Sequence, residues 1–148
     1  MLEGRFGDTT GSPYIEGQVS LPRLGVVSNV SFLVDTGASR SVLGAVDVRA
    51  MGVDISDLRG SVPVDGIGGT EYCFEEDAYL LFSDDEKTFY YRIDLLISSR
   101  SADDELRLPS ILGRHVLHRW KMYYSPTDPQ PTLAFEVVSD DLSIPMDS

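Results

Sequence analysis

The sequence predicts a single domain built almost entirely of β-strands. Short runs of Val, Ile, Leu, Phe and Tyr recur along the chain, and turn-forming Gly, Pro, Asn and Asp residues separate them. Only two stretches, near 47–51 and 114–120, have the pattern of helices, and both are short. The 148 residues are enough to bury one core. We therefore expect an all-β fold with one or two short helices.

The predicted strands follow one another between residues 13 and 138, which we take as the domain proper. Residues 1–12 carry three glycines and little apolar content, so we expect a flexible N-terminus. The strand-like segments that follow are 14–21, 24–27, 30–34, 41–43, 72–82, 88–97, 108–112, 121–124 and 133–138. Residues 139–148 are polar and acidic, and we expect a disordered tail there.

Asp35 is the residue around which the predicted domain is organised. It ends the apolar run Phe32-Leu33-Val34, so its carboxylate is expected at the end of a buried strand. Thr36 and Gly37 follow, and glycine permits a tight turn with close approach by another backbone. The simplest interpretation is a polar turn after a core strand. The alternative is a carboxylate held rigidly at the edge of a packed core, a position suited to a reactive group.

A second informative stretch, 62–72, places three glycines around one isoleucine, Ile67, between apolar flanks. The pattern is typical of a hairpin with a glycine-rich turn. Glycines at such a tip also permit large backbone changes when a ligand enters, which favours a mobile flap. An exposed Ile67 would then need an apolar contact, from a substrate or from a second flap.

Three motifs in this order resemble the retroviral-type (retropepsin-like) aspartic proteases. They are Asp35-Thr36-Gly37 after an apolar strand, Gly66-Ile67-Gly68-Gly69, and Ser110-Ile111-Leu112-Gly113-Arg114 late in the chain. The resemblance implies a closed acid-protease barrel over residues 13–138 and an aspartic endopeptidase that needs no cofactor or metal. In that family a pair of carboxyls shares one proton and activates water.

The resemblance also implies roles for individual residues. Asp35 would be the catalytic carboxylate, with Thr36 and Gly37 supporting the active-site loop. Substrate binding would fall to Ala38, Ser39, Asp65, Gly66, Ile67, Gly68 and Gly69. The sequence holds only one Asp-Thr-Gly, so a pair of acids requires two chains related by a two-fold axis. We therefore expect a homodimer that cleaves extended peptides.

The chain departs from the family pattern at several positions. Many retroviral members carry acids where this chain has Ser39 and Arg40, and those acids pair with the arginine that matches Arg114. The sequence leaves the partner of Arg114 open. Both chain ends are extended and polar, so the strands that form the dimer sheet are also left open.

Composition excludes several classes of partner and chemistry. The net charge of −12 and the absence of a basic cluster disfavour nucleic acid and anionic membranes. No stretch is long enough to span a bilayer, and no signal peptide is evident. One cysteine, Cys73, excludes an internal disulfide framework. We expect an intracellular, cytoplasmic protein, or a domain of a larger one.

Other candidate sites are weaker. His115 and His118 are three residues apart on the second predicted helix, a spacing compatible with metal binding, but no third ligand stands at a recognisable spacing. Surface histidines are the favoured interpretation. The competing function is a catalytically idle module of the same fold that serves dimerisation or peptide binding. A third possibility is an unrelated β-barrel with accidental motifs.

Overall fold

The computed structural model describes residues 1–66, 69–99 and 108–146. Its strands are β1 (Leu2–Glu3), β2 (Arg5–Phe6), β3 (Pro13–Leu21), β4 (Val26–Val34), β5 (Val42–Leu43), β6 (Val62–Gly66), β7 (Gly69–Ser83), β8 (Lys87–Ser98), β9 (Ile111–Leu112), β10 (Trp120–Ser125), β11 (Thr132–Val137) and β12 (Leu142–Pro145). Its α-helices are α1 (Ala45–Ala50) and α2 (Arg114–Leu117). The predicted all-β fold with two short helices is confirmed. Neither helix approaches the length and hydropathy of a membrane span.

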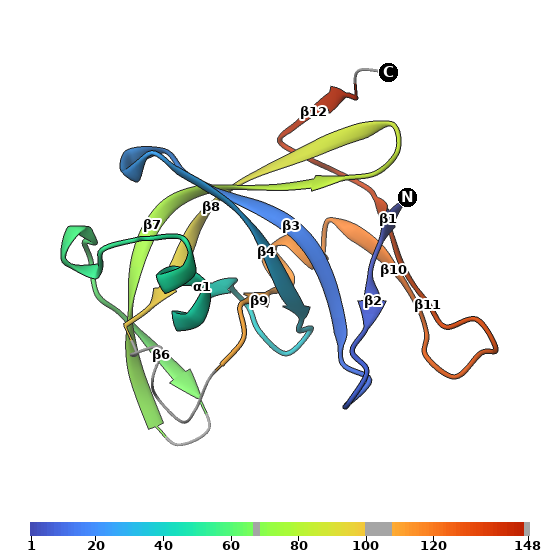
Figure 1. Ribbon diagram of the computed structural model, residues 1–148, viewed down its shortest axis with the longest axis horizontal. Coiled ribbons are helices and arrows are strands. Elements are labelled where there is room, and N and C mark those ends of the chain that lie inside the picture. Colours follow the sequence, from blue (N-terminus) through green and yellow to red (C-terminus); the bar gives the residue numbers. More distant parts are fainter. Residues whose placement is uncertain (67–68, 100–107, 147–148) are drawn as a thin grey trace.

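Six of these strands close into a barrel. They follow the order β8-β5-β9-β4-β3-β7, and pairing of β7 with β8 completes the circle. Closure removes the sheet edges that would otherwise stay open. β6 and β12 extend the sheet beyond the barrel, next to β7 and β8 respectively. Figure 1 shows the β6–β7 hairpin extending away from both chain ends.

The barrel core forms because alternate residues of each strand point inward. In β4, for example, Val30, Phe32 and Val34 are buried. Large aromatic rings fill the space between the barrel and the remaining strands. The ring of Phe82 lies 5.0 Å from that of Trp120, which in turn lies 5.1 Å from Phe135. Such edge-to-face and tilted contacts add to the free energy gained by burying the rings.

A second sheet, of order β1-β11-β10, lies against the barrel (Figure 1). The sequence predicts a flexible start over residues 1–12, whereas Leu2 is fully buried and pairs with Phe135 of β11. Arg5 and Phe6 pair with the first residues of β3. The first residues are held in place because Leu2 enters the core and Phe6 packs against it.

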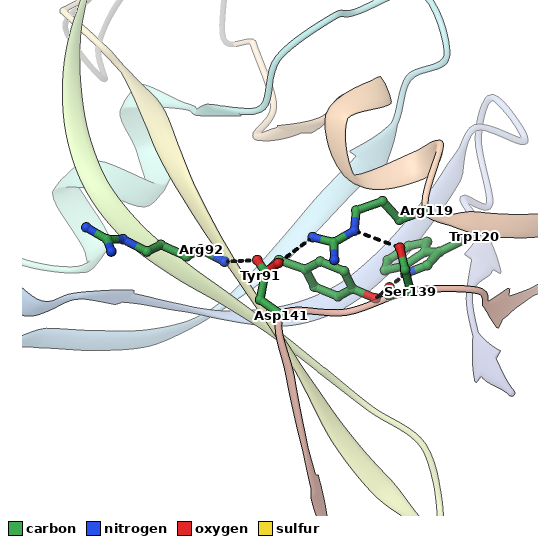
Figure 2. Close-up of polar contacts among 6 residues, drawn as sticks. All are labelled: Tyr91, Arg92, Arg119, Trp120, Ser139 and Asp141. Carbon is green, nitrogen blue, oxygen red and sulfur yellow. Dashed lines mark hydrogen bonds and ion pairs between the residues drawn. The ribbon is translucent and has the colours of Figure 1, made fainter.

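The C-terminal segment is also held in place. The sequence predicts disorder over 139–148, whereas Leu142–Pro145 form β12 and pair with β8. Figure 2 shows the contacts that precede this strand. The Arg119 guanidinium donates to the Asp141 carboxylate and to Ser139 Oγ, each at 2.9 Å, and its Cζ lies 4.9 Å from the Tyr91 ring centroid.

Behind this contact, a chain of hydrogen bonds runs into the core (Figure 2). Trp120 Nε1 donates to the Tyr91 hydroxyl at 2.7 Å, and that hydroxyl donates to the Ser139 carbonyl at 2.9 Å. Burial raises the pKa of Tyr91. The buried Trp120 N–H and Tyr91 hydroxyl thus both have hydrogen-bond partners. The bond to the Ser139 carbonyl fixes the point where the C-terminal segment leaves the core.

Candidate active site

Asp35 stands directly after β4, where two chain segments run in parallel. Leu33 and Val34 pair with Ile111 and Leu112 of β9. The Asp35 N–H continues this ladder by donating to the Leu112 carbonyl at 3.1 Å. Asp35 is partly buried, and the next two residues are exposed. The carboxyl group is therefore set at the rim of the barrel by a strand that cannot shift without breaking the core.

The loop orients the Asp35 carboxylate with its own backbone. The Gly37 N–H donates to Asp35 Oδ1 at 2.8 Å, and the Ala38 N–H donates to the Asp35 carbonyl at 3.2 Å. A Cβ atom at Gly37 would lie 3.1 Å from Asp35 Oδ1, closer than ordinary contact. Glycine at this position thus lets the main chain approach the carboxylate closely enough to hold it.

Helix α2 braces the loop from the other side, and it supplies the partner of Arg114 that the sequence left open. Arg114 Nη1 donates to the Thr36 carbonyl at 3.0 Å. The backbone N–H of Arg114 donates to the Ala38 carbonyl at 2.8 Å, and that of His115 donates to the Ser39 carbonyl at 3.3 Å. The carbonyl groups of Thr36, Ala38 and Ser39 are therefore tied to one turn of helix.

The close approach of α2 depends on Gly113. A Cβ atom there would lie 2.5–2.9 Å from the backbone of Arg40, a distance that requires the backbone to move. The φ angle of Gly113 is −99°, which any residue adopts, so the requirement is steric. Gly113, the glycine of the late motif, thus lets α2 pack closely against the backbone of Arg40.

A buried serine and a histidine link the same two segments. The Ser41 side chain is fully buried, and its Oγ accepts from the Gly113 N–H at 3.0 Å and lies 2.8 Å from His115 Nε2. The Ser41 N–H also donates to that nitrogen at 3.0 Å. Burial, aided by the nearby Arg40 charge, lowers the pKa of His115. Because Nε2 accepts from the Ser41 N–H, it carries no proton, and the imidazole is neutral.

Two further buried or half-buried contacts surround the loop. Ser110 is fully buried; its Oγ accepts from the Gly44 N–H at 2.9 Å and donates to the Asp47 carboxylate at 2.5 Å. Arg40 donates to the Glu75 carboxylate at 2.7 Å and to the Asp94 carbonyl at 2.8 Å, which joins the loop to β7 and β8. The sequence signalled neither serine as a structural residue; the one available signal is a hydroxyl placed beside a turn in an apolar segment.

The structure places the other predicted substrate-binding residues in two groups. Ala38 is half-buried and Ser39 exposed, in the loop that carries Asp35. Asp65, Gly66 and Gly69 lie in the β6–β7 hairpin, with Asp65 opposite Thr70 and Gly66 opposite Gly69. The hairpin predicted at 62–72 is present. Ile67 and Gly68 lie outside the described residues, so the proposed flap tip does too.

An open hollow of about 440 Å³ adjoins the Asp35 loop. Its lining residues are Pro13, Val34, Thr36, Met122 and Tyr124. They come from the start of β3, the end of β4, the Asp35 loop and β10. The wall is mostly apolar, and it is next to the catalytic candidate without including it.

The closed six-stranded barrel with its two short helices has the retropepsin-like fold. Residues 19–75 match the family model described as aspartyl protease, a span that holds both the Asp35 loop and the β6–β7 hairpin. The structure is similar to that of a retropepsin-like aspartic protease from Rickettsia conorii, with a TM-score of 0.59 over 99% of this chain and 92% of that one. At 18% sequence identity this likeness concerns the fold. No match was found among curated proteins. The family match over residues 19–75 and the structural likeness both agree with the retropepsin-like fold that the sequence predicts.

Proposed function

We propose that the protein is an aspartic endopeptidase that acts as a homodimer. The observation that carries the proposal is the Asp35 carboxylate, held at 2.8 Å by the Gly37 N–H in a loop that α2 braces. A carboxylate fixed in this way at the end of a barrel strand is positioned to act on a substrate. The matching family and fold support that use.

The chemistry needs a second acid, which one chain does not supply at this loop. Two carboxyls a few ångströms apart cannot both ionise at low cost, so they share one proton. The ionised member takes a proton from water as it attacks the peptide carbonyl, and the protonated member donates to that carbonyl oxygen. A two-fold axis beside Asp35 would place the partner subunit's Asp35 against it. The exposed Thr36 would then meet its own symmetry mate.

The substrate class we propose is an extended peptide. Ala38 and Ser39 would form the floor beside the acids, and the hairpin with Asp65, Gly66 and Gly69 would close over the peptide. Ile67 and Gly68 would complete that cover. A peptide in strand conformation can bond to backbone groups on both sides, and closure excludes water from the reacting centre.

The single cysteine, Cys73, supports an intracellular location.

The test is the variant Asp35→Asn, assayed on a peptide library. Because the amide can neither hold nor release the shared proton, cleavage should fall at least about a thousandfold. Sedimentation should show an unchanged dimer. Asp128→Asn, an exposed aspartate in the turn between β10 and β11, is the control with the same change of charge and should cleave as the wild type does.

Two outcomes would contradict the proposal. Cleavage retained in Asp35→Asn would remove the mechanism. A wild-type chain that dimerises and binds peptide without cleaving any library member would be the idle module of the same fold.

A further inference from the structure

The base of the β6–β7 hairpin is a stretch of β7 that is paired with a strand on one side only. β7 pairs with β8 along residues 73–83, while its other edge pairs with β6 over 69–73 and with β3 over 79–81. Among the described residues, no strand pairs with 74–78 on that second edge. Strand pairing therefore holds the base of the hairpin from the β8 side alone, and other contacts must hold it from the opposite side.

Two neighbouring glutamates in this stretch point to opposite faces of the sheet, and an arginine holds each of them. Successive side chains of a strand alternate between its faces. The Glu76 side chain is only 5% exposed, and Arg23 Nε donates to both of its carboxylate oxygens at 3.0 Å. The Glu75 side chain is 37% exposed, and its carboxylate accepts from Arg40 at 2.7 Å. The base of the hairpin is thus held on both faces.

The buried pair spans the gap beside β7. Arg23 belongs to the 3₁₀ turn Pro22–Leu24 between β3 and β4, and its Nη2 also donates to the Asp57 carbonyl at 2.8 Å. Asp57 ends the second 3₁₀ turn, Ile55–Asp57, in the segment that leads to β6. One planar guanidinium therefore joins three segments. A carboxylate as deeply buried as that of Glu76 is costly without a partner, so the pair resists separation.

The second pair connects the hairpin to the active-site loop. Arg40 lies in the loop that begins at Asp35, and it donates to the Asp94 carbonyl of β8 at 2.8 Å as well as to Glu75. The Glu75 N–H makes a longer bond, 3.4 Å, to the Arg59 carbonyl. A change in the direction of the hairpin would therefore break the bond between Arg40 and Glu75 or displace the loop that carries Asp35.

We propose that Arg23 and Arg40 are positioning residues of the peptidase, which hold the base of the hairpin at a fixed direction relative to Asp35. Neither arginine touches the reacting atoms. A hairpin that is oriented before the peptide arrives loses less conformational freedom on binding, so the peptide binds more tightly. The inference rests on the proposed function, in which the hairpin covers the peptide, and it adds the residues that orient the hairpin.

The kinetic test uses Glu75→Gln and Glu76→Gln, which keep the side-chain size and remove the charge. We expect KM to rise about threefold to tenfold in each variant, with kcat within about twofold of the wild type, because Asp35 and its loop are unchanged. A loss of folded or dimeric enzyme would lower kcat and leave KM unchanged. Glu16→Gln is the matched control: Glu16 on β3 accepts from Arg5 at 3.3 Å, and both constants should stay as in the wild type.

A double-mutant cycle tests whether Arg40 acts through Glu75. If the two side chains act as one pair, Arg40→Gln combined with Glu75→Gln should raise KM no more than either change alone. The charge-swapped pair, Arg40→Glu with Glu75→Arg, should bring KM back toward the wild-type value. Effects that multiply in the double variant, with no rescue by the swap, would overturn the role of Arg40.

Hydrogen exchange tests the same inference without any cleavage. Amide exchange over residues 62–66 and 69–73 should accelerate in Glu75→Gln and Glu76→Gln, while β10 keeps its protection. Glu16→Gln should exchange as the wild type does. Circular dichroism shows whether each variant is folded, and should Glu76→Gln fail to fold, the partly exposed pair of Arg40 and Glu75 still carries the test.

The outcomes separate the two proposals. Unchanged KM and unchanged exchange in the folded variants would overturn the inference and leave the proposed peptidase standing. A wild-type chain that cleaves no peptide would overturn the proposed function and with it the kinetic role of the arginines. Exchange that accelerates in such a chain would still show that the two pairs hold the hairpin.

Discussion

At the scale of single residues, polar groups buried near the active-site loop determine how the loop is held. His115 is half-buried against Ser41, whereas the sequence favoured a surface position; His118 is exposed. Glu76, in the acidic run Glu75-Glu76-Asp77, is buried and accepts from Arg23 Nε at 3.0 Å. Residue type and helical spacing fix a position on an element, but they do not say which distant segment packs over it.

The neutral state of His115 makes stability depend on pH. Its pKa is lowered in the folded chain, so below the unfolded value of about 6.5 the unfolded state binds a proton that the folded state does not. Stability is therefore unaffected above that pH and falls as pH drops through it, by at most about 1.4 kcal/mol per pH unit.

Urea unfolding at pH 7.5 and 5.5 checks this expectation. His115→Gln keeps an acceptor for the Ser41 N–H but does not titrate, so it should lose less stability than the wild type over that interval. His118→Gln, at the exposed histidine, should behave as the wild type does. An equal loss in wild type and His115→Gln would show that other groups cause it.

At the scale of elements, the sequence predicted those whose signal is local. The apolar run before Asp35, the glycine-rich hairpin and the long strand β8 have strong local patterns, and each is present. The predicted strands 24–27 and 30–34 are one strand, β4, preceded by a turn in which Gly25 has a φ of +65°. β12 was missed because its four residues have little pattern of their own and are held by β8 and Arg119.

Arg119 and Asp141 should therefore control how firmly β12 is held. Asp141 accepts from the Arg119 guanidinium at 2.9 Å and from the Arg92 N–H at 2.8 Å, and these bonds lower its pKa against the opposing effect of burial. Asp141→Asn should weaken both bonds and cost about 1 kcal/mol. Hydrogen exchange should accelerate in β12 while β10 keeps its protection.

The matched control is Asp140→Asn, which removes the same charge one residue earlier. No side-chain hydrogen bond or ion pair of Asp140 is found among the described residues, so exchange in β12 should stay as in the wild type. Equal acceleration in the two variants would point to net charge and not to the contacts in Figure 2.

At the scale of the whole molecule, the proposed active site and the net charge have opposite effects on the association of two chains. The chemistry proposed for Asp35 needs two chains, yet each chain carries a net charge of −12. Their mutual repulsion opposes association, and it acts over distances that salt shortens to about 10 Å at 0.1 M and 3 Å at 1 M. An apolar contact between two chains would not weaken in the same way.

Added salt should therefore strengthen the dimer. Sedimentation at 0.05 M and 0.5 M sodium chloride should show a dissociation constant several-fold lower at the higher concentration, because screening removes part of the repulsion. Cleavage per mole of chain at low protein concentration should rise in parallel. Weaker association in salt would mean that pairs of opposite charge hold the two chains together.

The way in which Arg114 holds the loop bears on which substitutions related chains can accumulate. Arg114 binds the main-chain carbonyl of Thr36, an atom that every amino acid possesses. This brace therefore tolerates evolutionary drift at position 36 and restricts it at position 114.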